Sequence, residues 1–199
     1  MAQPRIFPNK PSIPTDVLQL ILEHVDKADL ANMCLLNKIC CPCSQDFLYR
    51  DIRIDGYLST AKVCQTLSES THLARRVRSF KIINYNHYIE WRKWQECGLQ
   101  KSLRNMINLR SLYLLCNTDS RGYTNFSDMD GYTFKLLSFA NNLFPSGPLA
   151  RFLHSQPSLT DVSLVGFASD DLEFGASLPN LTRISAAFSS IRQLVPNRP

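Results

Sequence analysis

The sequence is poor in glycine and has no long apolar run, and these absences exclude several functions. Only 7 of its 199 residues are glycine, and none forms the glycine-rich loop that cradles a nucleotide phosphate. No stretch approaches the roughly 20 apolar residues of a membrane-spanning helix. Residues 1–12 are polar and proline-rich, unlike a secretory signal peptide. We therefore expect no membrane partner and a location in the cytoplasm, the nucleus or both.

The sequence also lacks the signatures of catalysis and of nucleic-acid binding. Its four histidines have no serine or cysteine in a recognisable triad pattern. The net charge of +5, from 22 basic and 17 acidic residues, is mild. Arg75, Arg76 and Arg78 form a basic cluster, but no recognition helix or stacking motif accompanies it. We expect a protein that is not an enzyme, binds no cofactor and binds no nucleic acid.

Cysteines are present in an odd number, seven, and do not have the spacing of a metal site. Cys40, Cys41 and Cys43 lie close together in the sequence. A zinc site also needs a second pair of ligands at a distance, and the next cysteine, Cys64, is isolated. Asp128 and Asp130 suggest calcium, yet the loop lacks the acidic residue that would complete the site. We therefore predict reduced thiols, largely buried, and no metal.

Residues 13–54 carry the densest apolar pattern. Pro14 fits the start of a helix, and Ser12 or Thr15 is a candidate N-cap. The helix has one broad apolar face, with Leu20 off it. The face consists of Val17, Leu18, Ile21, Leu22 and Val25.

Two further helices and a strand are expected after this face. Asp26 is placed to begin the second helix. A third helix follows from Lys38, and Pro42 predicts that it is short or irregular. Apolar and polar residues then alternate over residues 50–54, as expected of a strand.

These landmarks together resemble an F-box. The resemblance covers Ile13-Pro14-x-Asp16-Val17-Leu18-x-x-Ile21-Leu22, then Asp29-Leu30, Cys34-Leu35-Leu36-Asn37-Lys38 and Asp46-Phe47-Leu48-Tyr49-Arg50. It implies a three-helix module that docks a Skp-type adaptor and, through it, a cullin. The plain alternative is a helical cap on a larger domain. The residues expected either to face the adaptor or to form the module's core are Ile13, Pro14, Val17, Leu18, Ile21, Leu22, Leu30, Leu35 and Leu36.

The rest of the chain repeats one apolar-x-x-apolar-x-apolar pattern. It begins at residues 77, 109, 134, 159 and 181, a spacing of about 22–32 residues. Residues 52–199 thus resemble a divergent leucine-rich-repeat array with a parallel sheet. Helices are expected at 60–70, 99–106 and 148–154. The alternative is an ordinary α/β layer with loosely similar strands.

The repeat strands should present a ladder of polar side chains to solvent, because alternate residues of a strand face opposite sides. The ladder comprises Ser79, Lys81, Ser111, Tyr113, Leu136, Ser138, Asp161, Ser163, Arg183 and Ser185. From it we select Lys81, Tyr113, Ser138, Asp161 and Arg183 as candidate substrate-binding residues. The aromatics Tyr88, Trp91 and Trp94 either anchor a partner or pack in the core.

The sequence thus predicts an α+β or α/β solenoid in three parts: a disordered lead over 1–12, an F-box-like module over 13–51 and a repeat domain over 52–199. The last part either ends its sheet near Pro196 and Pro199 or is truncated relative to the family. The resemblance implies a substrate-recognition subunit of a Skp/cullin/F-box ubiquitin ligase, with an unidentified protein substrate. The alternative is a non-ligase scaffold whose F-box-like helices only cap the solenoid.

Overall fold

The computed structural model describes residues 13–36, 38–84, 98–116, 131–142, 146–164 and 178–185. The chain divides into two compact units, Met1–Leu48 and Tyr49–Pro199, and each is considered by itself. The lead over 1–12, the aromatic segment over 85–94, the calcium-like residues Asp128 and Asp130, and the chain end lie outside the described residues.

The first unit is helical. Its helices are α1 (Thr15–Leu22), α2 (Lys27–Leu36) and α3 (Cys40–Arg50), the last of which continues into the second unit. The unit's core consists of Leu18, Leu22, Leu30 and Cys43, with partly buried Val25, Met33, Cys40, Phe47 and Leu48 around them. Three helices were expected over this range, and three are present.

Two local predictions for these helices are wrong. Pro14 is the N-cap of α1 and no side chain caps it, so Thr15 does not act as the cap. The third helix is neither short nor broken, because it has 11 residues. Pro42 is its third residue, within the first turn, where the missing N–H has no intrahelical partner to lose.

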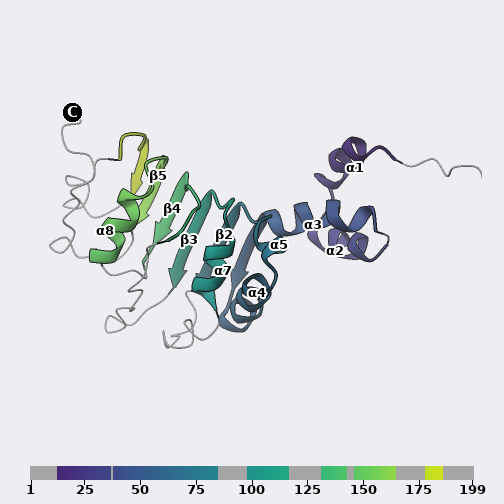
Figure 1. The fold of residues 1–199 in the computed structure, drawn as a ribbon, viewed down its shortest axis with the longest axis horizontal. Coiled ribbons are helices and arrows are strands. Elements are labelled where there is room, and N and C mark those ends of the chain that lie inside the picture. The colour runs from purple at the N-terminus through teal and green to yellow at the C-terminus, as the bar shows by residue number, and fades with distance from the viewer. Residues whose placement is uncertain are drawn as a thin grey trace, which may run out of the picture. The chain divides into compact units, whose positions relative to one another are not determined.

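The second unit is built on a parallel sheet, so the chain is an α+β protein. The described residues form six strands in the order β1-β2-β3-β4-β5-β6, and each strand pairs with the strand before it in sequence (Figure 1). The strands are β1 (Asp51–Asp55), β2 (Ser79–Asn84), β3 (Ser111–Cys116), β4 (Ser138–Asn141), β5 (Asp161–Leu164) and β6 (Arg183–Ser185).

Among the described residues, the helices lie on one face of this sheet, and we call the other face the open face. The helices are α4 (Tyr57–Glu69), α5 (Thr71–Ala74), α7 (Leu99–Asn105) and α8 (Ser146–His154), and α4, α7 and α8 lie on the same side (Figure 1). α4 begins directly after Gly56, three residues before the expected start at residue 60. The buried row of the sheet runs through Ile52, Phe80, Leu112, Phe139, Val162 and the partly buried Ile184.

The register corrects one predicted strand. The pattern over 134–139 suggested that Leu136 faces solvent and that Leu137 lies in the core. Instead, Phe139 pairs with Leu112, Leu136 is buried and Leu137 is exposed. The segment FKLLSFAN contains two overlapping copies of the motif, and the later one places a polar residue, Asn141, at a buried position. Because Asn141 is polar, the apolar pattern did not indicate which residues of this strand face the core.

The strands are joined at their starts by a recurring pair of hydrogen bonds. The carbonyl oxygen of Arg78 accepts the N–H of Arg110 at 2.8 Å and that of Ser111 at 3.0 Å. The same double acceptance recurs on the carbonyls of Arg110, Leu137 and Thr160. We call these the strand-entry carbonyls. They show that residues 78, 110, 137 and 160 occupy equivalent places.

Candidate protein-binding surfaces

Helix α1 presents apolar side chains on two sides. Leu18 and Leu22 are buried in the core of the first unit, whereas Ile13, Val17 and Ile21 are exposed. Ile13, Val17 and Ile21 follow one another at intervals of four residues, so the two residues within α1 share a helix face that is distinct from the core face. The broad face predicted from the sequence is therefore two faces, one buried and one open to solvent.

Three more large apolar residues are exposed in the first unit. Leu35 and Leu36 end α2, and Ile39 directly precedes α3. Their exposed fractions are 85%, 69% and 61%. We call the exposed side chains of Ile13, Val17, Leu20, Ile21, Leu35, Leu36 and Ile39 the apolar surface.

The structure sorts the predicted adaptor residues into two groups. Leu18, Leu22 and Leu30 are buried and hold the helices together. The others are exposed: Ile13, Pro14, Val17, Ile21, Leu35 and Leu36.

Sequence reasoning missed Leu20 and Ile39. Leu20 lies three residues after Val17, so its helical spacing could have placed it with Val17 rather than off the apolar face. Exposed apolar residues are common singly, so seven of them in one small unit make the apolar surface a candidate site for a partner.

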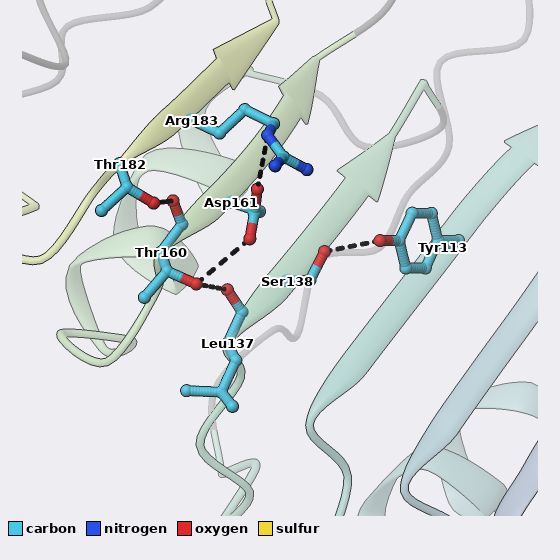
Figure 2. A network of polar contacts seen from close by, with 7 residues as sticks. All are labelled: Tyr113, Leu137, Ser138, Thr160, Asp161, Thr182 and Arg183. Carbon is cyan, nitrogen blue, oxygen red and sulfur yellow. Dashed lines mark hydrogen bonds and ion pairs between the residues drawn. The ribbon is translucent and has the colours of Figure 1, made fainter.

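A chain of polar contacts crosses the open face of the sheet in the second unit. The Lys81 Nζ lies 4.5 Å from the centroid of the Tyr113 ring. The Tyr113 and Ser138 hydroxyl oxygens are 2.6 Å apart and share a hydrogen bond (Figure 2). These three residues come from β2, β3 and β4, so each of three neighbouring strands contributes one side chain to the contacts.

The contacts continue on β5 and β6. The Arg183 Nε lies 3.3 Å from the Asp161 Oδ1, and Thr160 donates from its hydroxyl to the Asp161 carboxylate at 3.2 Å. The Thr160 hydroxyl also lies 2.9 Å from the Leu137 carbonyl oxygen, and the Thr182 hydroxyl donates to the Thr160 carbonyl (Figure 2). With 84% of the Arg183 side chain exposed, the ion pair is mainly a surface feature.

All five candidate substrate-binding residues therefore lie on the open face. Lys81 and Tyr113 occupy one register row, and Ser138, Asp161 and Arg183 occupy the neighbouring row. Leu136 does not belong to the ladder, and Ala140 takes its place in the row of Lys81 and Tyr113. Whether these residues bind a substrate stays a prediction.

Two asparagines join successive strand segments at their turns, a role that the motif comparison did not reveal. The Asn108 Nδ2 donates to the Arg75 carbonyl at 2.7 Å, and the Asn180 Nδ2 donates to the Pro157 carbonyl at 2.9 Å. Both asparagines precede the first residue of their strand by three positions. The shared phrases INLRSL and PNLTRI contain both residues, so the signal was present in the sequence.

Five cysteines, Cys34, Cys40, Cys41, Cys43 and Cys64, form no disulfide. Cys43 and Cys64 are buried, and Cys34, Cys40 and Cys41 are partly buried. The Cys34 thiol lies 3.8 Å from the Cys41 carbonyl oxygen. Within the described ranges, no three histidine, cysteine or acidic side chains gather as metal ligands would.

A comparison with protein-family models finds no match for the chain, and a comparison with curated protein sequences finds none either. Among the helices that the structure describes, none combines the length and the apolar character needed to cross a bilayer. The two surfaces described above therefore carry the functional argument by their own geometry.

Proposed function

We propose that the chain is a substrate-recognition subunit of a Skp/cullin/F-box ubiquitin ligase. In this proposal the apolar surface binds a Skp-type adaptor, and the open sheet face binds a protein substrate. The observation that carries it is the division of α1, where Leu18 and Leu22 fill the core while Val17 and Ile21 remain exposed. The F-box resemblance of residues 13–50 gives this exposed surface a partner of known kind.

Such a subunit makes and breaks no bond. It holds a substrate close to a conjugating enzyme, and this raises the effective concentration of the substrate's lysines there. The two functions need two surfaces that are chemically different. The first unit supplies apolar side chains, and the sheet supplies polar and charged ones. This difference supports separate partners for the two surfaces.

Co-expression with a Skp-type adaptor tests the proposal. Ile21→Asp should abolish co-purification, because it replaces an apolar contact by a charge that must be desolvated at the interface. The variant should keep the helical circular-dichroism signal of the original chain, since 47% of Ile21 is exposed. Leu18→Asp is unsuitable for this purpose, because Leu18 is a core residue.

Leu58→Asp is the matched control. Leu58 is an exposed leucine in the second unit, on α4, and its variant should co-purify with the adaptor as the original chain does. If the original chain fails to capture the adaptor, the proposal is wrong and the scaffold alternative takes its place. Full capture by a folded Ile21→Asp variant would contradict the assignment of the apolar surface.

A further inference from the structure

Two exposed arginines stand side by side where β2 and β3 begin. Arg78 and Arg110 occupy equivalent places, since the Arg110 N–H donates to the strand-entry carbonyl of Arg78 at 2.8 Å. Neighbouring strands are about 4.8 Å apart, so the two side chains start from adjacent positions. Neither guanidinium makes a hydrogen bond or an ion pair with the part of the chain that the structure describes. Among the described residues, nothing therefore competes with a ligand for either guanidinium.

One side chain at an equivalent place contacts a residue of the open face. Thr160 occupies the equivalent place before β5, because its carbonyl also accepts two N–H groups from the following strand. Its hydroxyl contacts the carboxylate of Asp161, a residue of the open face. An arginine is longer than a threonine, so Arg78 and Arg110 can extend over the same face beside Ser79 and Ser111.

Lys81 supplies a third positive charge. It lies three residues after Arg78, which corresponds to about 10 Å along a strand, and its ammonium group rests over the ring of Tyr113. The sequences of β2 and β3, SFKIIN and SLYLLC, contain no acidic residue. We call Arg78, Lys81 and Arg110 the basic strip.

We infer that the basic strip binds an acidic peptide segment in an extended conformation. Each guanidinium has the planar fork that binds a carboxylate with two hydrogen bonds. Acidic side chains at alternate positions of an extended peptide are about 6.6 Å apart, a spacing that the strip can span. The identification of this peptide as part of the ligase substrate rests on the proposed function. The binding of the peptide itself requires no adaptor.

The distribution of charge favours a peptide over a nucleic acid. Carboxylates lie on strands to either side of the strip. Asp51 and Asp55 are on β1, where Arg53 between them pairs in register with Lys81, and Asp161 is on β5, beyond β4. A single nucleic-acid strand carries a negative charge at intervals of about 3.4 Å, so a strand laid across the sheet would meet these carboxylates. A short acidic segment places its few charges on the strip alone. The ring of Tyr113 adds an apolar contact beside them.

Fluorescence anisotropy on the full chain tests this inference with three labelled probes of equal length. The first is a peptide with glutamate at alternate positions, the second has glutamine in place of each glutamate, and the third is single-stranded oligouridine. We expect the glutamate peptide to bind at least about tenfold more tightly than the glutamine peptide, and the difference to shrink in high salt. The oligouridine should bind more weakly than the glutamate peptide.

The double variant Arg78→Gln/Arg110→Gln should weaken binding of the glutamate peptide by at least about tenfold. The control is Arg151→Gln, because Arg151 is an exposed arginine on α8, and its affinity should stay within about twofold of the original. Circular dichroism should show both variants folded. Equal binding of the two peptides, an unchanged affinity in the folded double variant, or tighter binding of oligouridine would each overturn the inference.

Two further measurements separate this inference from the proposed function. Ile21→Asp should bind the glutamate peptide normally, and Arg78→Gln/Arg110→Gln should still capture a Skp-type adaptor. Peptide binding without adaptor capture would support the basic strip and contradict the ligase role. Adaptor capture without peptide binding would support the ligase role and overturn the inference.

Discussion

Leu18 and Ile21 lie one helical turn apart on α1, yet Leu18 is 5% exposed and Ile21 is 47% exposed. The first belongs to the core of the helical unit, and the second belongs to the apolar surface. Under the proposed function, stability and partner binding are therefore assigned to different residues of one short helix. This separation allows each property to be changed without the other.

Leu18→Ala should destabilise the first unit far more than Ile21→Ala does. Removing a buried leucine side chain costs about 2–5 kcal/mol through lost burial and the cavity it leaves. Ile21→Ala should cost less than about 1 kcal/mol, because the side chain is already half in water. Urea denaturation followed by circular dichroism measures both. Alkylation of the buried Cys43, followed by mass spectrometry, should accelerate only in Leu18→Ala, and equal effects of the two variants would contradict the assignment.

Asn108→Ala should destabilise the second unit by about 0.5–1.5 kcal/mol, the usual net contribution of one hydrogen bond. The amide group of Asn108 donates to the Arg75 carbonyl across the turn. Asn108→Asp should be no better than alanine, because a carboxylate offers no donor and faces a carbonyl oxygen. Urea denaturation measures the free energy of unfolding. Retention of full stability in Asn108→Asp would show that the amide donor is dispensable.

Gln156→Leu should destabilise the second unit by about 1–3 kcal/mol. Gln156 is fully buried, and its Oε1 accepts the N–H of Leu136 at 2.9 Å. Leucine has a similar volume but no acceptor, so the buried N–H of Leu136 would lose its partner. Hydrogen exchange should show reduced protection of the Leu136 amide. Gln65→Leu, at an exposed position of α4, is the control and should change the free energy of unfolding by less than about 0.5 kcal/mol.

Gly56 and Gly98 should differ in their tolerance of asparagine. Gly98 has φ 77° and ψ 20°, the left-handed conformation that asparagine also adopts, so Gly98→Asn should cost less than about 1 kcal/mol. Gly56 has φ 94° and ψ 152°, a region open in practice only to glycine, and Gly56→Asn should cost about 1–3 kcal/mol. No atom lies within 4 Å of an added Cβ at Gly56, so the penalty comes from the backbone alone. Thermal denaturation compares the two variants.

The sequence was sufficient for the strands whose apolar period is unbroken. Val77, Phe80 and Ile82 are all buried, and so are the corresponding residues around β3 and β5. The pattern failed at β4, where Asn141 occupies a buried position and an earlier copy of the motif competes with the correct one. Periodicity favours the wrong phase here, because the earlier copy has apolar residues at all three places and the correct copy has the polar Asn141 at its last place. The pairing of Phe139 with Leu112 resolves the choice.

The apolar surface was only partly predictable, for a different reason. Helical spacing groups Leu18 with Ile21 as readily as with Leu22. Which side faces the core depends on Leu30 and Cys43, which come from two other helices. The basic strip was missed because Arg78 and Arg110 are 32 residues apart in the sequence. Only the parallel pairing of β2 with β3 brings them together.

The strand-entry carbonyls have a consequence for how the chain tolerates change in length. Successive first residues of the strands, Asp51, Ser79, Ser111, Ser138, Asp161 and Arg183, share one register row although their separations differ. The strands β3, β4, β5 and β6 are each fixed at the start by the same pair of hydrogen bonds, so residues gained or lost between these strands need not shift the row. The connecting segments are therefore free to vary in evolution while the open face keeps its alignment.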